Sequence, residues 1–168
     1  MWLGVTVAIP EPYRSALATA RANSGDPLAE TIPPHVTLAP PTEVDGALLP
    51  DVQLALERVA ARCAPFTMSL TGTGTFRPVS PVVYVALRRG WDECTALQER
   101  INDGVLAQEL QFPYHPHVTI AHHLEDPQLD RAQEEMKGFR AEFTVSAIDL
   151  FEHEGQMWRK VQSFHLQG

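Results

Sequence analysis

A chain of 168 residues with 44% hydrophobic and 20% charged residues has the size and composition of one ordinary globular domain, which excludes disorder as the default interpretation. Its formal net charge of −8 argues against an extended nucleic-acid-binding surface, because such surfaces cluster Lys and Arg to replace phosphate counterions. The two cysteines lack the spacing of a metal or redox site, and the apolar N-terminus is too short for a membrane span, so we expect a reduced, cytoplasmic protein with no membrane segment.

The first part of the chain predicts a strand, a helix, a second strand and a second helix. Apolar residues alternate with small ones over residues 3–9, as in a strand with one buried face. A helix is expected at 11–22, and after a loop a strand follows to about Ala39, where Pro40 and Pro41 end it. Apolar residues recur every three to four positions over 46–63, which predicts the second helix.

The remainder predicts more strands than helices. Strands are expected at 66–71, 82–88 and 113–123, with a helix at 91–106. Asp126 as N-cap and Gly138 as C′ residue bracket a further helix, and a hairpin connection at 152–156 joins strands at 142–151 and 157–166. Because the strand-only stretches exclude a purely parallel βαβ run, we expect an α+β fold with antiparallel sheets, in one two-lobed domain over 1–168.

One five-residue phrase, Pro-His-Val-Thr followed by Leu or Ile, occurs twice, at 34–38 and 116–120. In a strand, the His and Thr of each copy point to one face and the aliphatic residues point to the other. We therefore predict one site to which two His-x-Thr strands contribute side chains. Its candidate catalytic residues are His35, Thr37, His117 and Thr119.

Two imidazoles and two hydroxyls are the minimum set for in-line displacement at phosphorus. Near neutral pH one histidine of a pair can accept a proton from the attacking water while the other donates one to the departing oxygen. Threonine hydroxyls can donate to the non-bridging oxygens, where charge accumulates. This scheme requires no metal and no cofactor. A zinc site at His115 and His117 is the competing hypothesis, but no cysteine or carboxylate pair lies nearby at ligand spacing.

Paired His-x-Thr strands about half a chain apart resemble the 2H phosphoesterase superfamily, and specifically its 2′-5′ RNA ligase-like, RNA 2′,3′-cyclic phosphodiesterase branch. Residues 8–10, the segment 74–85 and the terminal strand 158–166 are also similar to that branch. Two positions depart from it: Trp158 stands where Tyr is common and Tyr84 where Trp is common, although both keep an aromatic surface. The resemblance implies a bilobal α+β fold, in which two pseudo-symmetric antiparallel β-sheet lobes form a concave cleft and the helices lie outside.

The same resemblance implies hydrolysis of a 2′,3′-cyclic phosphate, on an RNA end or a small nucleotide, to a phosphomonoester that is most often the 2′-phosphate. It matches His35 to the general acid and His117 to the general base. Alternative substrates for the same site are ADP-ribose cyclic phosphate and 2′-5′-linked nucleotides, with 2′-5′ RNA ligation as the reverse reaction. An alternative of another class is a non-catalytic nucleotide-binding module. We expect a monomer.

Five further residues are candidate substrate contacts. The aromatic side chains could stack on a base or ribose, although a place in the core is the competing interpretation. The arginine follows a Gly-Thr-Gly-Thr-Phe turn and could reach a phosphate, and the histidine shares the strand parity of His117 and could line the mouth of the cleft. These candidates are Phe76, Tyr84, Trp158, Arg77 and His115.

Overall fold

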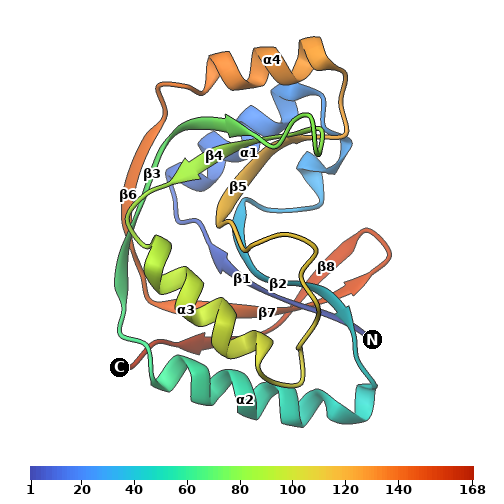
Figure 1. The fold of residues 1–168 in the computed structure, drawn as a ribbon, viewed down its shortest axis with the longest axis vertical. Coiled ribbons are helices and arrows are strands. Elements are labelled where there is room, and N and C mark those ends of the chain that lie inside the picture. The colour runs from blue at the N-terminus through green and yellow to red at the C-terminus, as the bar shows by residue number, and fades with distance from the viewer.

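The computed structural model describes all residues 1–168 and contains two four-stranded antiparallel sheets and four α-helices (Figure 1). This confirms the expected α+β class. None of the helices combines the length and apolar character needed to cross a bilayer. The strands are β1 (Trp2–Ala8), β2 (His35–Glu43), β3 (Phe66–Thr75), β4 (Val82–Leu87), β5 (His117–His122), β6 (Arg140–Val145), β7 (Ala147–Glu154) and β8 (Met157–His165). The helices are α1 (Tyr13–Ser24), α2 (Leu49–Ala61), α3 (Trp91–Asn102) and α4 (Asp126–Glu135), with 3₁₀ turns at Pro27–Glu30 and Gly46–Leu48.

The two sheets follow the same plan. Their strand orders are β2-β1-β7-β8 and β5-β4-β3-β6, so each His-x-Thr strand is an edge strand of its own sheet. The two edge strands, β2 and β5, lie against each other where the lobes meet (Figure 1). The repeated phrase of the sequence therefore corresponds to a repeated position in the fold.

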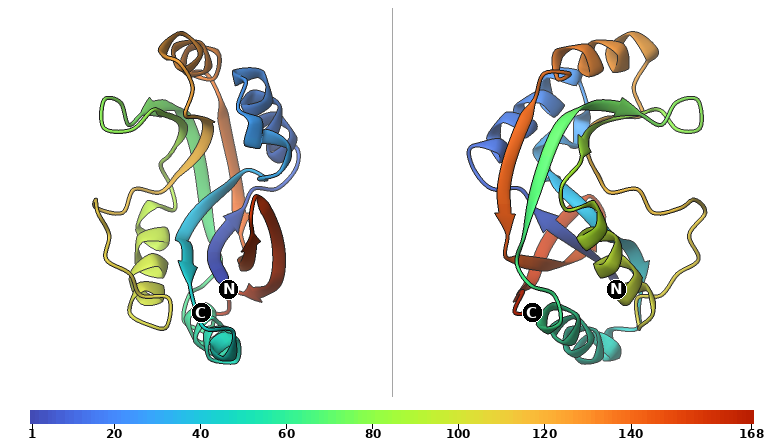
Figure 2. Two further views of the ribbon diagram at one scale, coloured as in Figure 1. Left: turned by 90° about the vertical axis from the view of Figure 1, so that its right-hand side faces the viewer. Right: turned by 60° about the vertical axis from the view of Figure 1, so that its left-hand side comes forward.

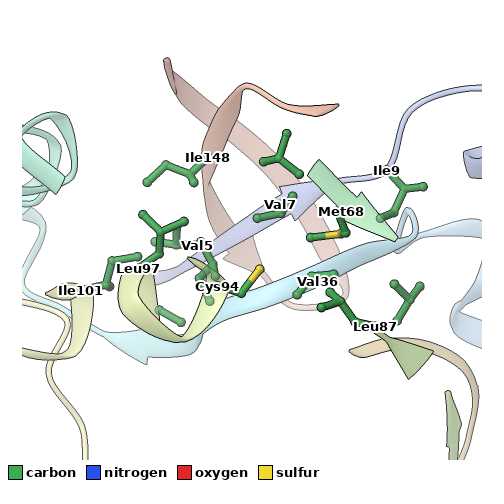
Figure 3. Packing of buried hydrophobic residues seen from close by; sticks show 14 of the residues in the cluster. Val5, Val7, Ile9, Val36, Met68, Leu87, Cys94, Leu97, Ile101 and Ile148 are labelled. Carbon is green, nitrogen blue, oxygen red and sulfur yellow. The ribbon is translucent and has the colours of Figure 1, made fainter. Parts of the chain in front are cut away.

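Helices exchanged between the lobes hold the sheets together. Helix α1 connects β1 to β2 but packs on β5, while α3 connects β4 to β5 but packs on β2. One apolar cluster of 33 residues runs through both lobes, so the chain forms a single core. Figure 3 shows part of it, where Cys94, Leu97 and Ile101 of α3 lie over side chains of the first sheet.

Two strand predictions were wrong. The strand expected at 142–151 is two strands, because the chain leaves the second sheet after β6 and enters the first sheet as β7, with Ser146 between them. The first motif strand does not end at Pro40 and Pro41 but continues to Glu43. Both prolines are tolerated because they lie at an irregularity of this edge strand, between the pairs Leu3–Thr42 and Val5–Ala39, where neither has a paired residue on β1.

Helix ends also differ from the prediction. Glu125, not Asp126, is the N-cap of α4, and its backbone N–H donates to Gln128 Oε1 at 3.2 Å. The helix ends with Met136 as its C-cap, and Gly138 is outside the left-handed region that a C′ glycine adopts. Helix α3 ends at Asn102 and β5 begins only at His117, so a longer connection, 103–116, lies between them.

Candidate active site

The two motif strands show the predicted alternation of faces. The aliphatic residues of each copy are buried in the core, and the histidines and threonines are half-buried. Because β2 and β5 lie against each other, the four polar side chains come from facing edges of the two lobes.

Each motif histidine is held by a carbonyl two residues before it. His35 Nδ1 lies 2.8 Å from the carbonyl oxygen of Pro33, and His117 Nδ1 lies 2.6 Å from that of His115. A carbonyl oxygen can only accept, so both Nδ1 atoms carry the hydrogen and donate it. In the neutral imidazole this leaves Nε2 unprotonated and able to take a proton.

Burial lowers the pKa of both motif histidines. For His35 the pKa falls to about 4, mainly by burial and further through the charges of Arg21 and His117, while the bond to Pro33 acts in the opposite direction. Burial also lowers the pKa of His117. Both imidazoles are therefore neutral at pH 7, and a bound phosphate anion would raise their pKa values, because an opposite charge favours the protonated form.

Aromatic rings surround the second motif histidine. The ring centroid of His117 lies 4.9 Å from that of Phe76 and 5.4 Å from that of Tyr84, which come from the end of β3 and from β4. Gly74 makes room for this arrangement, since a Cβ built on it would lie 2.5 Å from the Tyr84 hydroxyl oxygen. Phe76 and Tyr84 thus adjoin the second motif, as candidate contacts should.

An aromatic side chain also lies beside the first motif histidine. The hairpin of β7 and β8 brings the Trp158 ring to 4.8 Å from the His35 ring, measured between centroids. His153 lies 4.1 Å from Trp158 between ring centroids, and its Nε2 would be 3.3 Å from a Cβ built on Gly4. Sequence reasoning missed His153 because it assigned this residue to the hairpin connection. Strand parity could have predicted its position, because His153 points to the same face as Phe151 when the strand is extended to Glu154, as it is in β7.

His115 packs among the aromatic rings near His117 rather than lining an open cleft mouth. Its ring is 5.1 Å from Phe76 and 4.9 Å from Trp91, both edge-on, and its Nδ1 is buried without a hydrogen-bond partner. Its ring centroid is 6.0 Å from that of His117. No three of the His, Cys, Asp and Glu side chains come together in the arrangement of a metal site.

The structure directs the Arg77 side chain to helix α4. Its Nε donates to Thr75 Oγ1 at 3.1 Å, Nη1 to Asp130 at 2.9 Å and Nη2 to Gln133 Oε1 at 3.1 Å. All three guanidinium nitrogens are used in these bonds, so a phosphate would have to compete with them.

A buried ion pair that sequence reasoning did not find adjoins the site. Arg21 Nε donates to Asp26 Oδ2 at 2.8 Å, and the two residues are only 6% and 4% exposed. The other Asp26 oxygen accepts from the backbone N–H of Leu28 at 2.9 Å. Arg21 is one of the charges that lower the pKa of His35. Arg21 follows Leu17 by four residues on the buried face of α1, but residue type hides this signal, because an arginine on a helix is expected on the solvent side.

Comparison with known proteins places the chain among phosphoesterases. A family model described as the 2′-5′ RNA ligase superfamily matches residues 9–157. A protein of Bacillus cytotoxicus, provisionally named a phosphoesterase, is 32% identical over 171 residues, covering 99% of this chain and 97% of that protein. A Bacillus cereus protein with the same kind of name is 30% identical with the same coverage.

Solved structures share the fold. TT0787 of Thermus thermophilus has a TM-score of 0.74 at 24% identity, covering 100% of this chain and 99% of that one. Escherichia coli LigT, in complex with NADP+, has a TM-score of 0.72 at 21% identity, covering 99% and 98%. From the family match, the relatives and the paired motif strands together, the chain belongs to the 2′-5′ RNA ligase superfamily, the 2H phosphoesterases.

Proposed function

We propose that this protein hydrolyses 2′,3′-cyclic phosphates, on RNA ends or small nucleotides, to a phosphomonoester that is mainly the 2′-phosphate. The observation that carries the proposal is the pair of facing motif strands, each with an imidazole whose Nδ1 is held by a carbonyl at 2.8 or 2.6 Å and whose Nε2 is left for proton transfer. Two such groups beside two threonine hydroxyls match what displacement at phosphorus needs.

In the proposed reaction the cyclic phosphate lies between β2 and β5. One imidazole accepts a proton at Nε2 from a water molecule, whose oxygen forms a bond to phosphorus. The bond from phosphorus to the 3′ oxygen breaks, and the other imidazole donates its Nε2 proton to that oxygen. Thr37 and Thr119 donate hydrogen bonds to the non-bridging oxygens, where negative charge builds up.

The two histidines divide the acid and base roles. The family resemblance assigns the acid to His35 and the base to His117. The pKa of about 4 at His35 favours the opposite order, because an imidazole that is neutral in the free protein is able to accept a proton. The pH dependence of kcat/KM decides between them: the variant that loses the alkaline limb lacks the acid, and the variant that loses the acidic limb lacks the base.

The surroundings of the motifs suit a small nucleotide. Trp158 beside the first motif, and Phe76 and Tyr84 beside the second, offer faces for a base or ribose. LigT has been solved in complex with 3′-AMP, with NADP+ and with ATP, which supports a nucleotide substrate here. The net charge of −8 favours short substrates over long RNA. We also propose that the protein acts as a monomer in the cytoplasm, where its two cysteines stay free thiols.

Phosphorus NMR on a panel of substrates tests the proposal. The panel contains nucleoside 2′,3′-cyclic phosphates, ADP-ribose 1″,2″-cyclic phosphate and a 2′-5′-linked dinucleotide, each with and without a chelator. We expect the nucleoside cyclic phosphates to be converted to 2′-phosphates and His35→Ala or His117→Ala to lower the rate by about 10²–10⁴-fold. His165→Ala, at an exposed histidine that ends β8, is the matched control. Faster turnover of another panel member would reassign the substrate, and nucleotide binding without any turnover would identify a non-catalytic module.

A further inference from the structure

A hollow of about 790 Å³ lies between helix α3 and the connection 103–116, outside the two motifs. Figure 2 shows this connection swinging out from α3 before the chain enters β5. The backbone N–H of Gln108 donates to Asn102 Oδ1 at 3.0 Å, and Leu106 is buried in the core, so the connection is anchored to the helix. The volume falls within the range of small-molecule sites, roughly 300–1,000 Å³.

The hollow adjoins the motif residues through Tyr114. This side chain lines the hollow, and its hydroxyl donates to the carbonyl oxygen of Thr37 at 2.7 Å. At the start of α3, Trp91 packs edge-on against His115, whose carbonyl holds His117. Tyr114 therefore joins one wall of the hollow to the strand that carries Thr37.

One buried polar side chain faces the hollow without a partner. Gln98 lines it from α3, is only 5% exposed, and makes no side-chain hydrogen bond within the protein. Its amide atoms are not fully enclosed by the protein, so they remain open to the hollow and can bond to a ligand there. A carboxamide presents a donor and an acceptor side by side, which is the complement of a nucleobase edge such as that of adenine.

The other lining residues favour a base over a phosphate. The carboxylates of Glu99 and Asp103 line the hollow together with the single cation Arg100, so the net charge repels an anion and attracts an amino group. Leu110 and Pro113 add an apolar surface against which a ring can lie.

We propose that this hollow binds the nucleobase adjacent to the nucleotide that carries the cyclic phosphate, with Gln98 bonding to an amino-bearing base edge. The inference rests on the proposed function and makes it more specific. The preferred substrate is then an RNA end of at least two nucleotides rather than a mononucleotide.

The test compares two substrates, adenylyl-adenosine 2′,3′-cyclic phosphate and adenosine 2′,3′-cyclic phosphate. We expect the wild-type protein to have a kcat/KM at least about tenfold higher for the dinucleotide. Gln98→Met keeps the side-chain volume but removes the amide, and should reduce this preference by about fivefold to tenfold. Gln53→Met, on α2, is the matched control and should leave the preference unchanged.

A second variant guards against a folding defect at the buried position. Leu110 is 39% exposed, so Leu110→Asp changes the wall of the hollow without disturbing the core, and it should reduce the same preference. Equal kcat/KM values for the two substrates, or a preference that neither variant reduces, would overturn the inference.

Calorimetry with the dinucleotide adenylyl-adenosine separates this inference from the proposed function. If no cyclic phosphate is hydrolysed but the dinucleotide binds and Gln98→Met weakens its binding, the proposed function is wrong and the subsite stands. Dinucleotide binding that Gln98→Met and Leu110→Asp leave unchanged would refute the subsite whether or not the protein is catalytic.

Discussion

The hydroxyl of Tyr114 ties the connection before β5 to the motif strand of the other lobe, and removing it should weaken the fold measurably. It donates to the Thr37 carbonyl at 2.7 Å, and burial raises the pKa of Tyr114 well above its usual range, so the hydroxyl remains a donor. Tyr114→Phe deletes the bond and leaves the carbonyl without this partner, which should lower the free energy of unfolding by about 1–2 kcal/mol. For a domain of this size each kcal/mol lowers Tm by about 2–4 °C.

Urea unfolding with a matched variant measures this effect. Tyr13 packs against Phe139 and Phe143 with ring centroids 6.4 and 5.9 Å away, and its hydroxyl makes no hydrogen bond within the protein. Tyr13→Phe should therefore change the free energy of unfolding by no more than about 0.5 kcal/mol. We expect Tyr114→Phe to lower the midpoint without changing the slope m. Equal stabilities for the two variants would refute the idea that this bond links the lobes.

Two further predictions concern the first motif histidine and the glycine beneath Tyr84. Lowering the pH from 7 to 5 should reduce the free energy of unfolding by about 2 kcal/mol through His35 alone, because this histidine has a pKa near 6.5 in the unfolded chain and about 4 in the folded protein. Urea unfolding at both pH values measures the effect. If His35→Gln has midpoints that depend on pH as strongly as those of the wild type, the prediction is contradicted. Gly74→Ala should lower the free energy of unfolding by about 1–3 kcal/mol, since its Cβ would lie 2.5 Å from the Tyr84 hydroxyl oxygen. In thermal unfolding, the double variant with Tyr84→Ala should lose less stability than the sum of the two single variants. Strictly additive losses would mean that this contact does not cause the destabilisation.

The faces to which the motif side chains point could be predicted because strand parity is a local property. Alternation alone placed His35 and Thr37 opposite the aliphatic residues that the core buries, and the structure keeps that arrangement. Repetition of the phrase also anticipated two related lobes, which the matching strand orders confirm.

What could not be predicted depends on tertiary packing. The alternating pattern over 142–151 continues through Ser146 although the chain changes sheets there, since both sheets bury one face in the same core. The pairing of Trp158 with His35 depends on how the β7–β8 hairpin lies against the sheet. The burial of Arg21 depends on a partner, Asp26, that follows the end of its helix.

The central claim is that two His-x-Thr strands act as one catalytic unit, and a double-mutant comparison tests it most directly. Groups that act together in one step lose activity in a strongly non-additive way. We predict that His35→Ala, His117→Ala and the double variant hydrolyse a nucleoside 2′,3′-cyclic phosphate at rates within about tenfold of one another, all far below wild type. Additive losses, or a single variant that retains wild-type kcat/KM, would contradict the account.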